Sequence, residues 1–424
     1  MSVYIVNGGN PLQGEIRIGG AKNSVLPIMA ASMLNLSETL LLDCPCIRDV
    51  TISAEILRRL GCRVILEGHT AEINSSGINK FEIPPDLMNK MRSSFIFLGA
   101  MLAVSGKAVC GYPGGCELGA RPIDLHLKAF KKLGVTYFEQ GGYIICDSSR
   151  FKACKVALDF PSVGATENIM LLACKQKGTT TIVNAAREPE IIDLQNFLNS
   201  MGARISGAGG SKIRIEGVAS LHSATKRIMS DRIVAATFMF AAATTGGSLN
   251  LKNADCKYLD SIILLLRDCG ADIYTRPDGL EIKCPPKMKS VDLLQTMPYP
   301  GFPTDAQSQA LSAFATMEGT SIIRETIFEN RFNQVAELKK MGADITVSDR
   351  TAIIRGVKKL SGAHIYSPDL RGGAALVLAA LGAEGTSIID NIHYIERGYD
   401  NLDEMLRTLG ADIHKENRTE ETYG

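Results

Sequence analysis

The sequence predicts an α/β protein of two domains, built from six copies of a β-α-β-α-β-β unit. A short phrase recurs six times, and each copy joins an apolar helical end, a glycine and an alternating strand. The glycines are Gly61, Gly134, Gly202, Gly270, Gly342 and Gly410, at intervals of 73, 68, 68, 72 and 68 residues. Glycine suits the left-handed position that ends a helix, and so regular a period is a property of the fold. A chain of 424 residues is also too long for one ordinary core.

The first copy shows the expected elements in order. Residues 14–18 (GEIRI) predict a strand, residues 22–34 a helix that is apolar on nearly all sides, and residues 38–45 a second strand. An amphipathic helix over 51–60 then leads into a hairpin over 63–75. The helix that is apolar all round recurs as SSFIFLGAMLAV, ENIMLLAC, IVAATFMFAAA, AQSQALSAFATM and AALVLAALGA. We therefore expect a buried helix in every copy.

Six units of this size divide naturally into two domains of three units each. Residues 217–230 have weaker periodicity and are the expected crossover between the domains. A solenoid is the alternative, but solenoid repeats usually span only about 20–50 residues. A cleft between two compact bodies would be the default ligand site.

The composition is that of a folded protein without a strong overall charge. Hydrophobic residues make up 45% and charged residues 21%, while 46 Lys and Arg nearly balance 45 Asp and Glu. No overall basic field exists to bind nucleic acid or an anionic membrane, so any anion site must be built locally. The amino terminus has no basic start followed by an apolar run, and apolar stretches such as 374–382 are too short for a membrane span. A cytoplasmic location is expected.

The cysteines indicate buried, reduced thiols. Eleven are scattered without a C-x-x-C pair, and no histidine stands at a zinc-finger offset from Cys44 and Cys46, the closest two. Neither a disulfide framework nor a metal site is expected. The chain also lacks the glycine motifs of dinucleotide and P-loop sites, so no cofactor is predicted.

Charged residues gather where helices are expected to begin. The buried helices are preceded or opened by Lys22, Arg92, Asp231 and Arg232, Asp305, and Asp369 and Arg371; the amphipathic ones by Arg121, Arg187, Arg331 and Arg397. A cation at a helix start is disfavoured by about 0.3–1 kcal/mol, so a repeated pattern suggests a compensating phosphate or carboxylate. The alternative is that each cation pairs with a neighbouring Asp or Glu, or caps a strand.

Two segments carry candidate reactive groups. In PGGCELGARP, glycines surround Cys116 and the loop runs into Arg121, which favours a mobile, reactive thiolate over an incidental surface cysteine. His126 follows, as a structural hydrogen-bonding group or a catalyst. In PYPGFPTDAQSQ, three prolines stiffen the approach to Asp305, a candidate general base. The alternative is that Asp305 or Thr304 caps the helix.

Eight motifs, in order, make the chain resemble the UDP-N-acetylglucosamine 1-carboxyvinyltransferases of the enolpyruvyl transferase family. They are GGAKNSVLPI, PGGCELGARPIDLH, PSVGATENIM, NAAREPEIIDL, PGFPTDAQSQ, ETIFENRF, DLRGGAALVLAA and HYIERGYDNLDEML, and they span essentially the whole chain. The resemblance implies a two-domain inside-out α/β barrel. One domain would cover residues 22–229 and carry the cysteine loop, and the other, discontinuous domain would combine 1–21 with 230–424. The cleft would close when the sugar nucleotide binds, with the cysteine loop as its lid.

The resemblance also implies an activity and its residues. The enolpyruvyl group of phosphoenolpyruvate would pass to the 3′-hydroxyl of UDP-N-acetylglucosamine with release of phosphate, the first committed step of peptidoglycan precursor synthesis. Cys116, Asp305, Lys22 and Arg397 would be catalytic, with Cys116 as proton donor, site of a phosphoenolpyruvate adduct and target of fosfomycin. Phosphoenolpyruvate would be held by Lys22, Asn23, Arg92, Arg121, Arg371 and Arg397. The sugar nucleotide would be held by Asn23, Arg92, Arg121, Pro122, Ile123, Asp124, Leu125, Ser162, Val163, Gly164, Asp305 and Ile327.

One departure and two alternatives accompany this resemblance. Phe160 stands where some members carry Lys, which leaves a cationic contact to the nucleotide without support at that position. A 5-enolpyruvylshikimate-3-phosphate synthase would share fold and chemistry but lacks the PGGC-x-x-GARP segment. A non-catalytic regulator on the same fold would not need the four implied catalytic residues to be intact.

Overall fold

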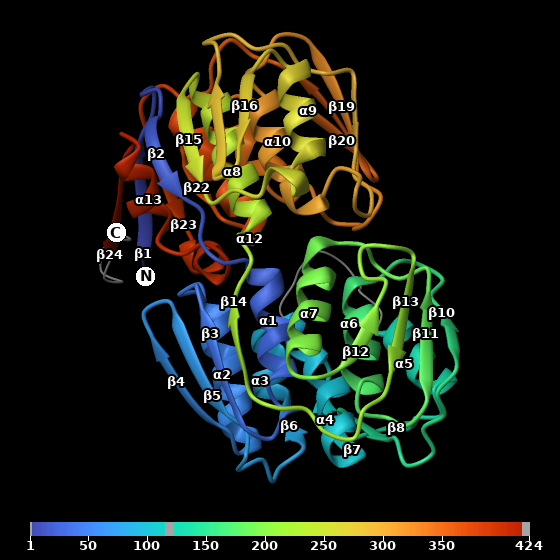
Figure 1. Cartoon of the computed structure of the whole chain (residues 1–424). Helices are drawn as coiled ribbons and strands as arrows, with labels where there is room; N and C mark the ends of the chain where they lie inside the picture. Colours follow the sequence, from blue (N-terminus) through green and yellow to red (C-terminus); the bar gives the residue numbers. More distant parts are fainter. Residues whose placement is uncertain (1, 115–122, 418–424) are drawn as a thin grey trace. The chain divides into compact units, whose positions relative to one another are not determined.

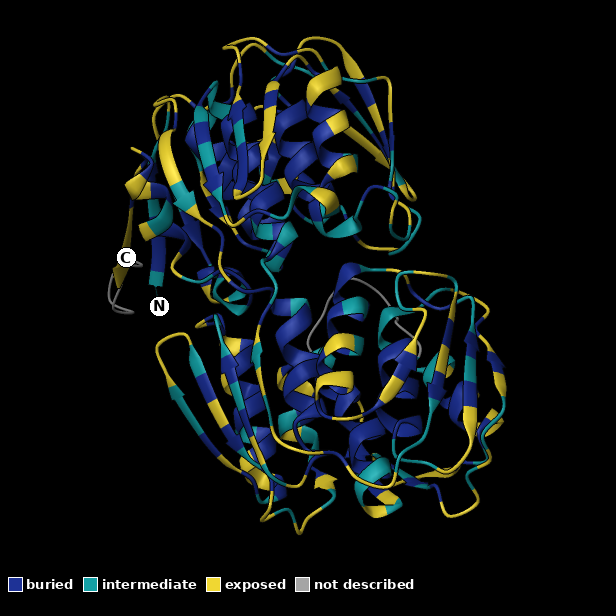
Figure 2. Ribbon diagram, viewed as in Figure 1, coloured by how far each residue is buried: buried dark blue, intermediate teal, exposed yellow. Residues whose placement is uncertain are grey.

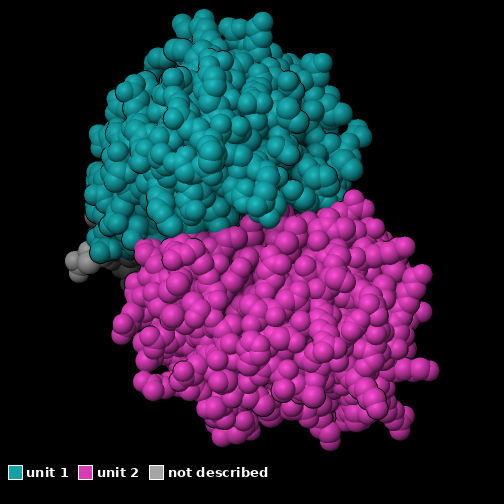
Figure 3. Space-filling model, viewed as in Figure 1, with its two compact units in different colours: residues 1–19, 117–120, 230–424 teal, residues 20–116, 121–229 magenta. Residues whose placement is uncertain are grey.

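The computed structural model describes residues 2–114 and 123–417, and these form two compact units (Figures 1 and 3). Among the described residues, unit 1 comprises 2–19 and 230–417, and unit 2 comprises 20–114 and 123–229. Each unit has its own hydrophobic core. None of the helices within the described ranges is both long and apolar enough to cross a membrane.

Unit 2 contains three four-stranded sheets. Its strands are β3 (Glu38–Leu42), β4 (Arg63–Glu67), β5 (Thr70–Asn74), β6 (Glu82–Ile83), β7 (Lys107–Gly111), β8 (Thr136–Gln140), β9 (Tyr143–Asp147), β10 (Lys155–Ala157), β11 (Thr179–Val183), β12 (Arg204–Ser206), β13 (Lys212–Glu216) and β14 (Ala224–Arg227). The strand orders are β14-β3-β5-β4, β6-β7-β9-β8 and β10-β11-β13-β12. In each sheet the first pair is parallel and the other two pairs are antiparallel.

Unit 1 repeats this arrangement. Its strands are β1 (Ser2–Asn7), β2 (Gln13–Arg17), β15 (Ser248–Lys252), β16 (Asp272–Arg276), β17 (Gly279–Lys283), β18 (Leu293–Gln295), β19 (Thr320–Arg324), β20 (Asp344–Ser348), β21 (Thr351–Arg355), β22 (His364–Tyr366), β23 (Thr386–Asp390) and β24 (Asp412–Asn417). They form sheets with the orders β16-β17-β15-β2, β18-β19-β21-β20 and β22-β23-β1-β24.

The predicted buried helices form the centre of each unit, and the sheets lie outside them. In unit 2 these helices are α1 (Lys22–Ala31), α4 (Phe97–Ser105) and α6 (Val163–Ala173); in unit 1 they are α8 (Arg232–Thr245), α10 (Gln307–Phe314) and α12 (Leu370–Gly382). The three helices of unit 1 contact one another, and in unit 2 α4 contacts both α1 and α6. Figure 2 shows these helices dark blue, with exposed residues on the surrounding strands. An apolar helix with no polar face needs such cover on all sides, and this confirms the inside-out barrel.

The remaining helices are mostly amphipathic and short. They are α2 (Arg48–Leu60), α3 (Pro85–Lys90), α5 (Asp124–Lys132), α7 (Pro189–Ser200), α9 (Asp260–Asp268), α11 (Val335–Lys340) and α13 (Leu402–Thr408), with 3-10 turns η1 (Arg92–Ile96), η2 (Cys256–Tyr258), η3 (Thr304–Ala306) and η4 (Ile392–Arg397). The predicted glycine stops are confirmed, because all six repeat glycines have φ between +80° and +105°. A residue with a side chain would be strained at such a φ.

Strand pairing departs from the expected repeat in two places. The strand predicted from GEIRI forms as β2, but it pairs in parallel with β15 of the fourth copy, while β14 takes its place beside β3. The sixth copy lacks its last strand, and β1 fills that position beside β24, with Ser2 opposite Asn417. Reading the first copy as a complete unit was therefore wrong. Residue alternation marks a strand, whereas main-chain hydrogen bonds choose its partner.

Candidate functional site

The predicted site residues divide between the two units. Cys116, Arg121 and Pro122 fall outside the described residues, so the cysteine lid stays a prediction. Unit 2 holds Lys22, Asn23, Arg92, Ile123, Asp124, Leu125, Ser162, Val163 and Gly164, and unit 1 holds Asp305, Ile327, Arg371 and Arg397. Within each unit, several of them lie at the beginnings of the central helices.

Asp305 in η3 is the partly exposed end of a buried ion-pair cluster. Its Oδ1 accepts a hydrogen bond from Arg331 Nη2 at 2.7 Å, and its Oδ2 accepts one from Arg371 Nη2 at 3.2 Å. The two arginine side chains are only 2% and 4% exposed, whereas the Asp305 side chain is 27% exposed. Two guanidinium groups therefore hold one carboxylate in its charged form while it still reaches solvent.

The helix-capping alternative for this segment is wrong. The N-cap of η3 is Pro303 and the N-cap of α10 is Ala306, so neither Thr304 nor Asp305 occupies a capping position. The Thr304 hydroxyl donates instead to Glu325 Oε2 at 2.9 Å. By contrast, Asp231 and Asp369 are the N-caps of α8 and α12, and each carboxylate accepts two backbone N–H bonds.

Glu325 organises the loop that carries Ile327. Its buried carboxylate accepts hydrogen bonds from the hydroxyls of Thr296 and Thr304, both at 2.9 Å. It also accepts from the backbone N–H groups of Ile327 at 2.7 Å and Phe328 at 3.1 Å. Since Glu325 uses the N–H of Ile327, this residue would contact a ligand through its side chain or carbonyl group.

Arg371 is held charged in the first turn of α12. Burial lowers the pKa of its guanidinium, but the charge of Asp305, followed by the charges of Tyr399 and Asp231 and a hydrogen bond with the Tyr399 side chain, outweighs burial and raises the pKa above its ordinary value. The guanidinium carbon lies 5.5 Å from the centroid of the Tyr399 ring. The segment η4, which ends at Arg397, packs against α12.

Several buried polar atoms around Asp305 lack hydrogen-bond partners among the described residues. They are Nε of Arg331, Nη1 of Arg371, Nε2 of Gln307 and both amide atoms of Gln334. An unsatisfied buried donor costs roughly 1–3 kcal/mol, and more when it is charged. An anion that accepted from the two guanidinium groups would remove this cost, so the arrangement suits a carboxylate or phosphate.

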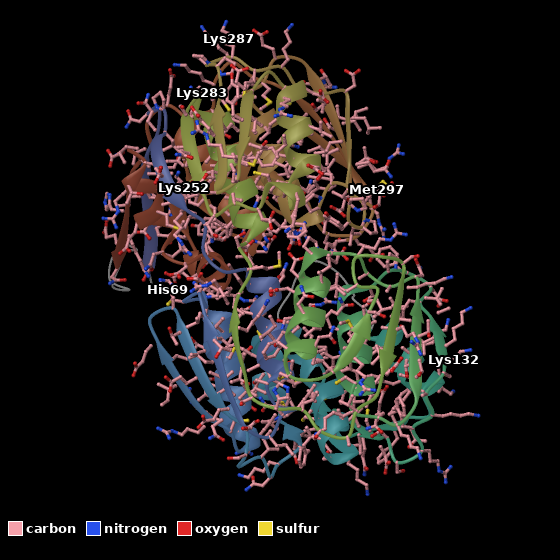
Figure 4. All side chains as sticks on the ribbon, in the orientation of Figure 1. His69, Lys132, Lys252, Lys283, Lys287 and Met297 are labelled. Atoms are coloured by element: carbon pink, nitrogen blue, oxygen red, sulfur yellow. The ribbon has the colours of Figure 1, made fainter. Side chains whose placement is uncertain are left out.

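In unit 2, Lys22 opens α1 and is buried, with only 8% of its surface exposed. Its Nζ lies 2.7 Å from Oδ2 of Asp49, which is buried on α2. Lys132, Lys283 and Lys287, labelled in Figure 4, lie at the outer surface, as lysines normally do. For Lys22 the predicted pairing with a nearby carboxylate is thus present, and it fixes a cation at a helix beginning.

The start of α6 brings together the predicted Ser162–Gly164 segment and His126. Ser162 is the N-cap, and its hydroxyl accepts from the N–H of Ala165 at 3.3 Å. A Cβ added to Gly164 would lie 2.9 Å from Cε1 of His126, so only glycine lets the imidazole approach this turn. A helix N-terminus with an adjacent imidazole suits a phosphate group.

Asn168 fixes the protonation of His126. The amide Oδ1 of Asn168 accepts from the N–H of Gly99 at 2.7 Å, so its Nδ2 is the atom 2.9 Å from Nδ1 of His126. Because an amide nitrogen only donates, Nδ1 of His126 accepts and the ring proton sits on Nε2. Burial, with the charge of Arg92, lowers the pKa of His126 to about 3. The sequence left two roles open for His126, a structural hydrogen-bonding group or a catalyst. Its Nδ1 atom has the structural role.

Two residues of the cluster were missed from sequence. Arg331 was noted only as a cation before an amphipathic helix, and Glu325 was not singled out, although both stand in the motif ETIFENRF. The signal for Arg331 in the sequence was its position just before a predicted helix, which is where the other cations also stand. Glu325 gave no signal of its own, because only the fold brings the hydroxyls of Thr296 and Thr304 to its carboxylate.

Comparison with known proteins covers nearly the whole chain. The family described as EPSP synthase (3-phosphoshikimate 1-carboxyvinyltransferase) matches residues 6–406. The UDP-N-acetylglucosamine 1-carboxyvinyltransferase 2 of Caldanaerobacter subterraneus subsp. tengcongensis is 50% identical over 413 residues, which is 97% of this chain and 99% of that protein. The enzyme numbered 1 from the same organism is 48% identical over 412 residues, again 97% and 99%. The crystal structure of the enolpyruvyl transferase NikO from Streptomyces tendae matches with a TM-score of 0.88 at 25% identity, covering 99% of both chains.

Proposed function

The chain belongs to the UDP-N-acetylglucosamine 1-carboxyvinyltransferases, within the EPSP synthase family, and from this premise we propose that it transfers the enolpyruvyl group of phosphoenolpyruvate to the 3′-hydroxyl of UDP-N-acetylglucosamine. Phosphate is the second product, and the step supplies peptidoglycan synthesis. The observation that carries the proposal is the partly exposed carboxylate of Asp305, backed by two buried guanidinium groups with unpartnered N–H donors among the described residues. The enolpyruvylshikimate alternative is set aside because the relatives that are 50% and 48% identical to this chain are named as UDP-N-acetylglucosamine 1-carboxyvinyltransferases.

The reaction requires an acid, a base and fixed cations. Cys116 gives a proton to C3 of phosphoenolpyruvate as the 3′-hydroxyl attacks C2, and Asp305 takes the hydroxyl proton. The tetrahedral adduct then returns a proton from C3 to the Cys116 thiolate that the first step leaves, the bond from C2 to the phosphate oxygen breaks, and phosphate leaves. Cys116 is also the proposed site of a covalent adduct with phosphoenolpyruvate. The reaction is an addition and an elimination without any change of oxidation state, and side chains hold the developing charges, so we propose no metal or organic cofactor.

The two guanidinium groups set the strength of the proposed base. Their hydrogen bonds hold Asp305 ionised, and they make the carboxylate a weaker base in the absence of substrate. An anionic substrate that accepts hydrogen bonds from the same groups weakens their hold on Asp305. Binding of phosphoenolpyruvate therefore raises the proton affinity of Asp305 when the hydroxyl must be deprotonated.

The remaining predicted residues divide by substrate. Lys22, Asn23, Arg92, Arg121, Arg371 and Arg397 hold phosphoenolpyruvate. Asn23, Arg92, Arg121 to Leu125, Ser162 to Gly164, Asp305 and Ile327 hold the sugar nucleotide, whose diphosphate suits the start of α6. The proposed enolpyruvyl-transferase domains are 22–229 and 1–21 with 230–424; among the described residues they differ from the two units only in that residues 20 and 21 fall in unit 2. A cytoplasmic location follows from phosphoenolpyruvate being an intracellular metabolite.

The test is release of phosphate by the purified protein. It should occur with phosphoenolpyruvate and UDP-N-acetylglucosamine together, but not when shikimate 3-phosphate replaces the sugar nucleotide or when either substrate is omitted. Asp305→Ala should lower turnover by about 10²–10⁴-fold, much more than it weakens nucleotide binding. The exposed Asp344, changed to Ala, is the matched control. Activity with shikimate 3-phosphate, or none with either acceptor, would refute the proposal, and loss of nucleotide binding alone would make Asp305 a ligand-positioning residue.

A further inference from the structure

A buried tyrosine joins the three central helices of unit 1. Tyr399 is only 3% exposed, and its hydroxyl lies 2.8 Å from Oγ1 of Thr237 on α8. Gln309 on α10 donates to the same hydroxyl from Nε2 at 3.0 Å. Thr237 directs its own hydroxyl hydrogen to the carbonyl oxygen of Ile233 at 2.8 Å, so the tyrosine hydroxyl donates to Thr237. The hydroxyl of Tyr399 is therefore fixed as both donor and acceptor.

The ring of Tyr399 supports Arg371, which comes from the third helix, α12. The guanidinium carbon is 5.5 Å from the ring centroid, and both side chains are excluded from solvent. A cation over an aromatic face within about 6 Å is attracted to it, more strongly when the pair is desolvated. The Nη2 group of Arg371 donates a hydrogen bond to Asp305, whereas its Nη1 group has no hydrogen-bond partner among the described residues. The guanidinium is thus held with one donor group left for a ligand.

We propose that Tyr399 is a positioning residue for anion binding. Its ring and its hydroxyl hold the Arg371 guanidinium, whose buried Nη1 is left for the anionic groups of phosphoenolpyruvate, and Thr237 and Gln309 fix the tyrosine. The inference rests on the proposed function, in which Arg371 holds phosphoenolpyruvate. A residue that merely filled the core would need no hydroxyl, whereas this hydroxyl is met by partners on two different helices.

Four variants and one control separate the ring from its hydroxyl anchor. Tyr399→Leu removes the aromatic face, Tyr399→Phe keeps the ring without its hydroxyl, and Thr237→Val removes the anchor while leaving the tyrosine intact. Thr237→Ser restores the hydroxyl at the same site. Tyr394→Phe is the matched control, because Tyr394 lies in η4 with its ring against His393 rather than against Arg371.

The readout is the KM for each substrate in the phosphate-release assay, with thermal unfolding of every variant. Tyr399→Leu should raise the KM for phosphoenolpyruvate roughly tenfold or more, and Tyr399→Phe and Thr237→Val roughly threefold. Thr237→Ser, Tyr394→Phe and the KM for UDP-N-acetylglucosamine should stay within about twofold of wild type.

Equal rises in both KM values, or an unchanged KM for phosphoenolpyruvate in a folded Tyr399→Leu variant, would overturn the inference. If that variant does not fold, the comparison of Thr237→Val with Thr237→Ser decides, and identical kinetics for these two would overturn it as well. A wild-type protein without activity would instead refute the proposed function, so the two failures are distinguishable.

Discussion

Removing the carboxylate of Asp305 should destabilise unit 1 and make its thermal stability depend on added anions. Asp305→Ala leaves the guanidinium groups of Arg331 and Arg371, 2% and 4% exposed, without their shared counter-charge. Breaking a buried ion pair from one side typically costs about 3–5 kcal/mol. Since the Asp305 side chain is 27% exposed, solvent already compensates part of the charge, and we expect a loss of about 2–4 kcal/mol.

Thermal unfolding followed by calorimetry measures this loss. For a cooperative unit of this size, the expected decrease in Tm is about 5–15 °C. Inorganic phosphate should restore part of it, because an anion bound between the two arginines replaces the carboxylate; at about a hundredfold excess over Kd the gain is about 2.7 kcal/mol. Phosphate should therefore raise the Tm of the variant more than that of wild type.

The control is Asp344→Ala, which removes a carboxylate whose partner Arg355 is about as exposed as Asp344 itself. Its cost should be at most about 1 kcal/mol, with no special response to phosphate. An Asp305→Ala protein with an unchanged Tm, or with the same response to phosphate as wild type, would show that the two arginines do not depend on Asp305 for charge balance.

Three further predictions test other parts of the molecule. Cys116 should be alkylated faster than Cys46, the exposed thiol among the described cysteines, and fosfomycin should modify Cys116 and abolish phosphate release; equal labelling by peptide mass spectrometry would contradict this. Burial lowers the pKa of His126 from its ordinary 6.5 to about 3, so the unfolded chain binds the proton first as pH falls. The free energy of unfolding should then decrease below about pH 6.5 more steeply for wild type than for His126→Gln in urea titrations, and equal slopes would refute the burial argument. Gly134→Ala should cost more than Gly410→Ala although their φ values are +80° and +90°, because an added Cβ meets a backbone carbonyl oxygen at 2.2 Å only at Gly134. We expect about 1–2 kcal/mol at Gly410 and at least about 1 kcal/mol more at Gly134, and equal losses would show that the backbone yields.

Local patterns predicted the elements, but not all of their partners. The repeat glycines and the buried helices depend on residues adjacent in sequence, and both appear as expected. The pairing of β2 with β15 joins residues more than 200 positions apart, and β1 pairs with β24 across nearly the whole chain. Strand alternation is the same whichever strand lies alongside, so sequence could not choose these partners.

The same distinction holds for the candidate site. Asp305 and Arg371 were found because each stands beside a recognisable helix start. Their contact joins positions 66 apart, and the second contact of Asp305, with Arg331, joins positions 26 apart. Tyr399 offered no signal at all, since a tyrosine after a helical segment usually fills the core. Residue types indicated an anion site, and the fold determined which cations share one carboxylate.

The six central helices differ in how they begin. Side chains of Ser162, Asp231 and Asp369 cap α6, α8 and α12. Among the described helices, α1, α4 and α10 begin without a side-chain cap, as do the 3-10 turns that lead into α4 and α10. These are the starts that carry Lys22, Arg92 and Asp305. A cap there would add about 1 kcal/mol of stability but would occupy N–H groups that an anion can use. The repeat thus forgoes a side-chain cap at three of the starts that we assign to substrate, whereas α6 and α12, which carry Ser162 and Arg371, keep their caps and are assigned to substrate as well.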